Sequence, residues 1–215
     1  MQFIKWNLFW TDDSDGAKYG GCISASGIVN LPSNVTKRLD QLTGGELVAT
    51  MDLQTGLPVF DRFLGHFHES ESEPTVVIET LGGSSVRLTP DHLIHITTNS
   101  SDVIQAVQAK AVKFGDYVIT RKGEKHQKDK VVQVRKSGRV EHVVAPYTES
   151  GSLVVNGIVT SCYSRITSHR MAHLALYPLR WLTSFDHDDK IVTSYIRLLR
   201  CLGNVLLPSW YFGNE

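Results

Sequence analysis

Short runs of β-forming residues, separated by turn residues, fill the sequence from Cys22 to about Arg165. Val, Ile and Thr dominate these runs, and Gly, Asn, Asp, Ser or Pro stand between them, which is typical of strands joined by tight turns. The expected strands cover residues 46–51, 75–80, 85–88, 92–97, 117–121, 131–134, 140–144 and 152–159. The pattern predicts an all-β core.

This β-rich region also resembles itself. Residues 42–50 match residues 112–120 at an offset of 70, and residues 83–86 match residues 151–154 at an offset of 68. In the first pair, a glycine and then an acid lead into a strand in both copies. Similarity at a nearly constant offset indicates a duplicated unit, so we expect a pseudo-twofold all-β domain. A chance likeness between two hairpins is the alternative interpretation.

After residue 165 the spacing of apolar residues changes to that of a helix. An apolar residue recurs every three or four positions before Pro208 ends the run, namely at Tyr195, Ile196, Leu198, Leu199, Leu202, Val205 and Leu206. Residues 171–177 form a shorter helical candidate that ends at Pro178. The sequence therefore predicts three parts: a leader or remnant of a preceding domain at 1–21, a β-domain at 22–165 and a helical region at 166–215.

Charge and composition argue against several classes of function. The chain has 22 Lys and Arg against 22 Asp and Glu, and a net charge of zero does not favour binding to nucleic acid. The basic run at 122–136 contains Glu124 and Asp129 and is expected to be a solvated hairpin. No stretch approaches the roughly 18 apolar residues of a spanning helix. Lys5 and Asn7 interrupt the apolar start, which makes it a poor signal peptide.

The sequence Gly20-Gly21-Cys22 suggests chemistry at the cysteine. Because glycine permits backbone conformations closed to other residues, the peptide ahead of Cys22 can bend toward its own sulfur. The thiolate would then attack the Gly21 carbonyl, which converts the amide into a thioester and frees the α-amine of Cys22. The alternative is that Cys22 is only a small buried hydrophobic side chain.

Such a shift requires a general acid, because an amine leaves only when it is protonated. His92 is the candidate, since the unperturbed pKa of histidine suits this task. It stands in Thr89-Pro90-Asp91-His92, where Pro90 favours a tight turn that projects the Thr89 hydroxyl and the imidazole to one side. Thr89 is expected to hydrogen-bond the scissile peptide. The same sequence is also common in ordinary turns and helix starts.

A metal site is the less favoured interpretation of the other histidines. His66 and His68 stand two apart on an expected strand and would share a face, and His95 adds a third imidazole. No cysteine pair or carboxylate stands at ligand spacing, so we expect no metal. Three nearby acids are expected to lie in a solvated loop: Glu69, Glu71 and Glu73.

These features together resemble the autoprocessing (Hint) domain of Hedgehog proteins, over nearly the whole chain from Gly20. The likeness rests on residues 20–22, 42–51, 86–92 and, above all, 143–163, and it continues into residues 172–173 and 178–180. The resemblance implies the pseudo-twofold β-disc that Hedgehog proteins share with inteins, followed by a short helical C-terminal region. It also implies cleavage before Cys22 and attack of the cholesterol hydroxyl on the thioester, which is a single-turnover reaction in cis.

The family roles fall on matching positions of this chain. Cys22 matches the nucleophile, and the bond between Gly21 and Cys22 matches the cleavage site. Thr89 and His92 match the pair that polarises and protonates the scissile amide. Cys162 matches a second cysteine that lies near the nucleophile and can pair with it, a link that must be reduced before catalysis. The alternative for Cys162 is a small buried residue on a strand.

Two departures from related proteins affect the expected reaction. Inteins end this domain with His-Asn before a nucleophile, whereas residues 158–162 contain no Asn to cyclise, so full splicing is excluded. Hedgehog proteins carry an aspartate about forty-five residues after the nucleophile as a base toward cholesterol. With a gap of one inserted residue in the turn at 52–58, that position falls on His68, a neutral base without a charge to orient a hydroxyl. Asp61 is an alternative carboxylate if the gap is larger.

The resemblance also implies the partners. Residues 166–215 match the sterol-recognition region, where the candidate contacts at a membrane interface are Trp181, Trp210, Tyr211 and Phe212. Packing against the β-core is the alternative for each of them. The expected substrates are the protein's own N-terminal domain and cholesterol or another sterol as co-substrate, with no further cofactor. We expect a monomer in the secretory pathway (endoplasmic reticulum), secreted or membrane-associated.

Three other functions stay open at this point. The thioester would be resolved by water or another nucleophile if no sterol is accepted. A non-catalytic β-module that binds a lipid or a partner would keep the bond before Cys22 intact. A Cys-His hydrolase built on Cys22 and His92 would turn over in trans, although no third orienting residue is evident.

Overall fold

Strands make up most of the described chain, which comprises residues 21–98 and 101–164 of the computed structural model. The strands are β1 (Ile23–Ser24), β2 (Ile28–Asn30), β3 (Thr36–Arg38), β4 (Leu47–Met51), β5 (Pro58–Thr80), β6 (Ser85–Leu88), β7 (His92–Thr98), β8 (Ser101–Gln108), β9 (Tyr117–Lys122), β10 (Lys125–Thr148), β11 (Ser152–Val155) and β12 (Ile158–Ser164). Short 3-10 helices lie at η1 (Pro32–Asn34), η2 (Leu39–Gln41) and η3 (Ala109–Ala111). The predicted all-β core is confirmed.

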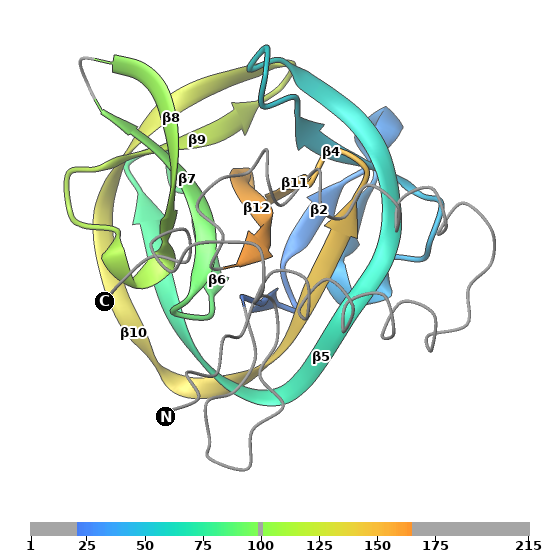
Figure 1. Ribbon diagram of the computed structural model, residues 1–215, viewed down its shortest axis with the longest axis horizontal. Helices are drawn as coiled ribbons and strands as arrows, with labels where there is room; N and C mark the ends of the chain where they lie inside the picture. Colours follow the sequence, from blue (N-terminus) through green and yellow to red (C-terminus); the bar gives the residue numbers. More distant parts are fainter. Residues whose placement is uncertain (1–20, 99–100, 165–215) are drawn as a thin grey trace, which may run out of the picture.

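Two long strands, β5 and β10, form the rim of a flattened disc (Figure 1). They pair antiparallel along much of their length, from Thr80 opposite Val131 to Phe63 opposite Thr148. The pairing is interrupted by five register shifts, and such bulges bend and twist a strand. The shorter strands β2, β4, β11 and β12 lie inside this rim (Figure 1). The sheet order is β3-β2-β11-β12-β7-β9-β10-β1-β6-β5-β4, with β8 paired to β7.

The sequence-based boundaries were wrong for the long strands. Residues 75–80 are only the end of β5, and the expected strands 131–134 and 140–144 both belong to β10. The expected strand 152–159 is two strands, β11 and β12, because Asn156 and Gly157 make a turn with positive φ values of 50° and 81°. The run 122–136 does lie in the β9–β10 hairpin, as expected.

The three glutamates of the expected solvated loop lie instead within β5. Glu69 and Glu71 are exposed, but Glu73 is only 5% exposed. The prediction of a loop failed because this polar stretch forms a strand that pairs with β10. Glu73 lies opposite Glu141, and Glu69 lies opposite Val144. Polar composition alone does not reveal such a partner.

The duplication is visible in matching backbone turns. Gly45 and Gly115 both have a φ of +93°, a conformation that favours glycine. The acid after each glycine closes the turn: the Glu46 carboxylate accepts from the Thr43 amide at 2.7 Å, and the Asp116 carboxylate accepts from the equivalent lysine amide at 2.8 Å. The second pair repeats as well, with Gly83 and Gly151 at φ +85° and +75° before β6 and β11. The predicted pseudo-twofold arrangement is confirmed.

The core fills the space between the two related units. Its main cluster contains fully buried side chains from both, including Leu39, Phe63, Val118 and Leu153. The residues that end the 3-10 helices, Leu42 and Val112, join the same cluster. Burial of this apolar area sets the register of the strands, since a one-residue slip would turn each strand's apolar side chains outward.

The parts expected on either side of the β-domain lie outside the described residues, except for Gly21. This holds for the leader at 1–20 and for the helical region at 166–215 with Trp181, Trp210, Tyr211 and Phe212. Within the described ranges, no helix has the length and apolar character needed to cross a membrane.

Candidate active site

Cys22 stands immediately before β1, in the middle of the sheet. β1 is paired on both sides, since Ile23 lies opposite Val144 of β10 and opposite Leu88 of β6. The Cys22 side chain is fully buried and packs with Val143 and Ala145 of β10. The two-sided pairing fixes the backbone at Cys22, so the peptide before it has a defined direction.

Thr89 holds the backbone of Cys22 on both sides of its α-carbon. The Cys22 amide donates a hydrogen bond to the Thr89 hydroxyl oxygen at 2.7 Å. The Cys22 carbonyl accepts from the Thr89 amide at 2.9 Å and lies 3.3 Å from the Thr89 hydroxyl. The nitrogen of the bond between Gly21 and Cys22 is therefore bound by Thr89, which is the contact expected from the sequence.

The turn after β6 brings His92 to the same place. The His92 amide donates to the Thr89 carbonyl at 3.0 Å, which closes the Thr-Pro-Asp-His turn at the start of β7. The imidazole is fully buried, and neither ring nitrogen makes a hydrogen bond of normal geometry with the described residues. The backbone carbonyls of Gly21 and Ser161 nevertheless influence the ring.

Burial dominates the electrostatics of His92. It lowers the pKa of the imidazole from 6.5 to about 4, while the two backbone carbonyls oppose the shift. The resting ring is therefore neutral at pH 7. A neutral imidazole beside the Gly21 carbonyl can take up a proton when negative charge develops there.

The depressed pKa of His92 predicts a loss of stability in acid. Between the folded value of about 4 and the unfolded value of 6.5, the unfolded chain binds more protons, so the free energy of unfolding falls as the pH falls. The full contribution of His92 is about 3 kcal/mol, from the shift of 6.5 to about 4 at about 1.4 kcal/mol per unit. Urea denaturation at pH 7 and pH 4 measures it. A His92→Gln variant should lose less stability over this interval, and an equal loss would contradict the assignment.

The Cys22 thiol is unusually weak as an acid. Burial, and secondly the negative charge of Glu73, raise its pKa from 9.0 to about 12. At pH 7 only roughly one thiol in 10⁵ is ionised at such a value. The resting group is therefore the thiol, and attack by sulfur requires a base that removes its proton during the reaction.

Cys162 is a second buried thiol but packs in a different part of the core. It belongs to the main apolar cluster, and its sulfur lies 3.5 Å from the Thr148 hydroxyl. Its amide donates to the Gly151 carbonyl at 2.9 Å. Cys22 and Cys162 are both thiols in this structure. The pairing that the family resemblance implies stays a prediction.

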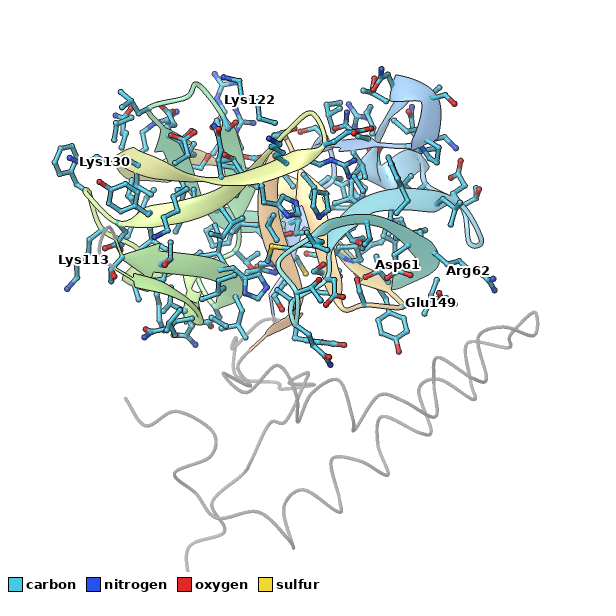
Figure 2. The ribbon with its side chains drawn as sticks, turned by 90° about the horizontal axis from the view of Figure 1, so that it is seen from above. Asp61, Arg62, Lys113, Lys122, Lys130 and Glu149 are labelled. Atoms are coloured by element: carbon cyan, nitrogen blue, oxygen red, sulfur yellow. The ribbon has the colours of Figure 1, made fainter. Side chains whose placement is uncertain are left out.

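His68 and Asp61 are the two residues that the sequence offers as a base toward the hydroxyl of the acceptor. His68 lies in β5, and its side chain is outside the described part. Asp61 lies near the start of β5, beside Arg62 and Glu149 (Figure 2). Its carboxylate accepts from the backbone amides of Arg62 and Ser150. Asp61 therefore has a structural task, which is to tie β5 to the turn before β11.

His66 and His95, which the sequence offered as further ligands of a metal site, have different surroundings in the structure. His66 directs Nε2 to the Leu39 carbonyl at 3.0 Å, and His95 is buried on β7. Among residues 21–98 and 101–164, no three His, Cys, Asp or Glu side chains gather closely enough to hold a metal ion.

Sequence reasoning missed the acids near Cys22. Glu141 of β10 accepts hydrogen bonds from the hydroxyls of Ser24 at 2.8 Å and Thr75 at 3.1 Å, and it contacts Arg87 at 3.4 Å. It thereby joins β1, β5, β6 and β10 on one face. Glu73 is buried opposite it. The only available signal was the strand alternation of Glu73 with Thr75, which the acidic surroundings obscured.

The comparisons with known proteins agree with this geometry. The family described as "Hint module" matches residues 10–202. This chain belongs to the Hint module family. The predicted resemblance to the Hedgehog autoprocessing domain is thereby confirmed, and the Hint module and its relatives support autoprocessing in general as the activity.

The curated relatives of this Hint module include hedgehog proteins. "Protein hedgehog" of Drosophila hydei is 31% identical over 168 residues, which cover 77% of this chain and 35% of that protein. "Indian hedgehog protein" of Xenopus laevis is 32% identical over 178 residues, covering 80% of this chain and 43% of that protein. The chain thus spans less than half the length of these relatives.

Solved inteins share the fold of this Hint module. A DnaB intein from Synechocystis sp. PCC 6803 matches with a TM-score of 0.58 at 13% identity, over 66% of this chain and 97% of that chain. The gp41-1 intein matches with a TM-score of 0.52 at 17% identity, over 66% and 98%. The predicted all-β Hint fold is confirmed.

Proposed function

We propose that this Hint module cleaves its own chain between Gly21 and Cys22 by an N–S acyl shift. The observation that carries the proposal is the contact between the scissile nitrogen and the Thr89 hydroxyl at 2.7 Å, with the buried His92 ring near the Gly21 carbonyl. Amide cleavage requires that the scissile peptide is held in place, here by the hydrogen bond from the Cys22 N–H to Thr89, and that a group such as His92 can protonate the departing nitrogen.

In the proposed reaction, the Cys22 sulfur attacks the carbonyl carbon of Gly21 and forms a tetrahedral intermediate. The S–H bond of Cys22 breaks as the sulfur attacks, and its proton passes to the His92 ring, which is neutral at rest and becomes cationic beside the negative charge of the intermediate. The bond from carbon to the Cys22 nitrogen then breaks, and the electron pair stays on nitrogen, which takes a proton from His92. The products are a thioester on the Cys22 sulfur and a free α-amine.

The second proposed step transfers the acyl group of Gly21 to a sterol hydroxyl, with cholesterol as the expected acceptor. This step is supported by the hedgehog relatives and by the aromatic residues of the region 166–215. The preceding domain would be released as its sterol ester, and the reaction would take place once per chain. We place it in the secretory pathway, at a membrane interface that supplies the sterol.

The decisive experiment fuses a reporter protein in front of residue 1 of the full chain. Purified fusion is incubated in buffer, with dithiothreitol, or with cholesterol in detergent, and the released reporter is analysed by mass spectrometry. We expect release ending at Gly21, with the mass of a thiol adduct in dithiothreitol and of a sterol ester with cholesterol. A bare carboxylate under every condition would assign hydrolysis instead. An intact bond throughout would identify a non-catalytic module.

The same fusion tests the position of His68. A carboxylate orients and deprotonates a hydroxyl better than a neutral imidazole, so His68→Asp should raise the ratio of cholesterol-dependent to thiol-dependent release several-fold. Thiol-dependent release is the internal control, because it does not need the hydroxyl to be activated. An unchanged ratio would remove His68 from the acceptor site.

A further inference from the structure

The two related halves of the disc hold one point of each rim strand in the same way. In the first half, the Gly45 amide donates to the Phe63 carbonyl of β5 at 2.8 Å. In the second half, the Gly115 amide donates to the Val131 carbonyl of β10 at 2.9 Å. Phe63 and Val131 are both fully buried. The backbone and the core beneath it therefore have the same requirements at this point in both halves.

The residue before each of these buried positions binds a second turn. The Glu149 amide donates to the Arg62 carbonyl at 3.1 Å, and the Leu81 amide donates to the Lys130 carbonyl at 2.8 Å. By this pattern Arg62 is equivalent to Lys130, and Glu149 is equivalent to Leu81. Each half thus brings together the turn before β4 or β9, one residue of the rim strand, and the turn before β11 or β6.

The side chains at these equivalent positions differ in polarity. The first half has Gly44 in the turn before β4, and Arg62 forms an ion pair with Glu149 at 3.7 Å. The second half has Phe114 at the position of Gly44 and Leu81 at that of Glu149, each 73% exposed. Because the first half makes the same backbone contacts with no apolar side chain at either position, the fold does not require these two. Large apolar side chains that are exposed together mark an interaction surface.

Lys130 lies between the two exposed apolar residues. Its carbonyl accepts from the Leu81 amide, and its Nζ lies 5.8 Å from the centre of the Phe114 ring. Lys113 is exposed and directly precedes Phe114. Figure 2 shows Lys113 and Lys130 at one end of the disc and the ion pair of the first half at the other. We call Leu81, Lys113, Phe114 and Lys130 the Phe114 patch.

Two acids near the Phe114 patch in the sequence are bound by backbone amides. The Asp116 carboxylate accepts from the Lys113 amide at 2.8 Å. Asp129 is only 8% exposed, and its carboxylate accepts from the Gly82 amide at 3.0 Å. Both acids therefore hold turns, and the patch presents two ammonium groups beside its apolar side chains.

We propose that the Phe114 patch docks the β-domain on an anionic phospholipid membrane. Its phenylalanine and leucine side chains enter the headgroup region, and its lysines contact lipid phosphates. Two turns with one large apolar side chain each are too small for a stable protein interface, which buries about 800 Å² on each partner. The inference goes beyond the proposed self-cleavage and does not rest on it, since binding to vesicles requires no reaction. It adds a membrane contact on the β-domain to the one expected at residues 166–215.

Exchange of residues between the two halves provides the test. The double variant Leu81→Glu/Phe114→Gly places the residues of the first half in the second, so its fold should be retained. The full chain is mixed with vesicles of phosphatidylcholine and phosphatidylserine, and the bound fraction is measured by flotation. We expect binding about 10-fold or more weaker than that of the wild type, because two apolar side chains no longer enter the bilayer. Lys113→Glu should weaken binding to these vesicles but not to vesicles of phosphatidylcholine alone.

Matched controls separate this contact from general effects on the protein. Leu57 is 60% exposed in the turn between β4 and β5, and Leu57→Glu should bind vesicles like the wild type. A photoreactive phenylalanine at position 114 should cross-link to lipid, whereas the same group at position 44 should not. Binding of the double variant at wild-type strength, or equal cross-linking at the two positions, would overturn the proposal. If the double variant has a lowered melting temperature, the cross-links alone decide.

Sedimentation of the chain without lipid tests a second copy as the alternative occupant. If the wild type self-associates, and the double variant does so less but binds vesicles equally well, the patch is an interface between copies and the membrane proposal is wrong. An uncleaved reporter fusion whose vesicle binding depends on the patch would instead overturn only the proposed self-cleavage.

Discussion

Cys22→Ala abolishes release of an N-terminal reporter under every condition, including high dithiothreitol and added cholesterol. The acyl shift needs the sulfur of the residue whose amide is cleaved, and alanine has no nucleophilic atom in its place. We expect no detectable product after a time in which the wild type is completely cleaved. Gel electrophoresis and the mass of the intact fusion provide the measurement.

Two further variants show that this loss reflects chemistry at one sulfur. Cys22→Ser retains a nucleophilic atom, so slow release through an ester is expected in place of fast release through a thioester. Cys162→Ala removes the other buried thiol, which packs against Thr148 in the main core, and should retain cleavage. Full cleavage by the Cys22→Ala variant would refute the acyl shift.

His92→Gln slows release by roughly 10²- to 10⁴-fold, the range expected when a general acid is lost. The glutamine side chain keeps polarity and approximate volume but cannot deliver a proton to the departing nitrogen. The rate in dithiothreitol, compared with the wild type at the same pH, gives the effect.

His95→Gln is the matched control for this prediction. His95 is also buried on β7, at 2% exposure, but it stands three residues further along the strand. We expect cleavage within a few-fold of the wild-type rate after His95→Gln. Equal losses in the two variants, with equal falls in melting temperature, would show that His92 acts only in packing.

The sequence allowed the turns and the site to be predicted where local chemistry determines them. A glycine with φ near +93° followed by a capping acid can be recognised at both 45–46 and 115–116, because the requirement lies within a few residues. The turn from Thr89 to His92 is local in the same way. Its contact with Cys22 was inferred from the required chemistry and from the family resemblance.

The long strands and the acids could not be predicted, because their partners are far away in the sequence. β5 and β10 both continue through polar stretches, which are held as strands because the two pair with each other. Five shifts in the register of this pairing also interrupt the alternation of buried and exposed side chains. Glu73 is buried because β10 covers it, although its neighbours Glu71 and Pro74 are exposed. A single residue's burial in such a stretch depends on tertiary pairing and not on local propensity.

The spread of the site along the chain has a consequence for biosynthesis. Cys22 meets Thr89 of the first half, while the carbonyl of Ser161, on the last described strand, is a neighbour of the His92 ring. A nascent chain that still lacks β12 also lacks this neighbour of the imidazole. Under the proposed self-cleavage, the reaction would therefore wait for the fold to be completed, and a truncated translation product would keep its preceding segment attached.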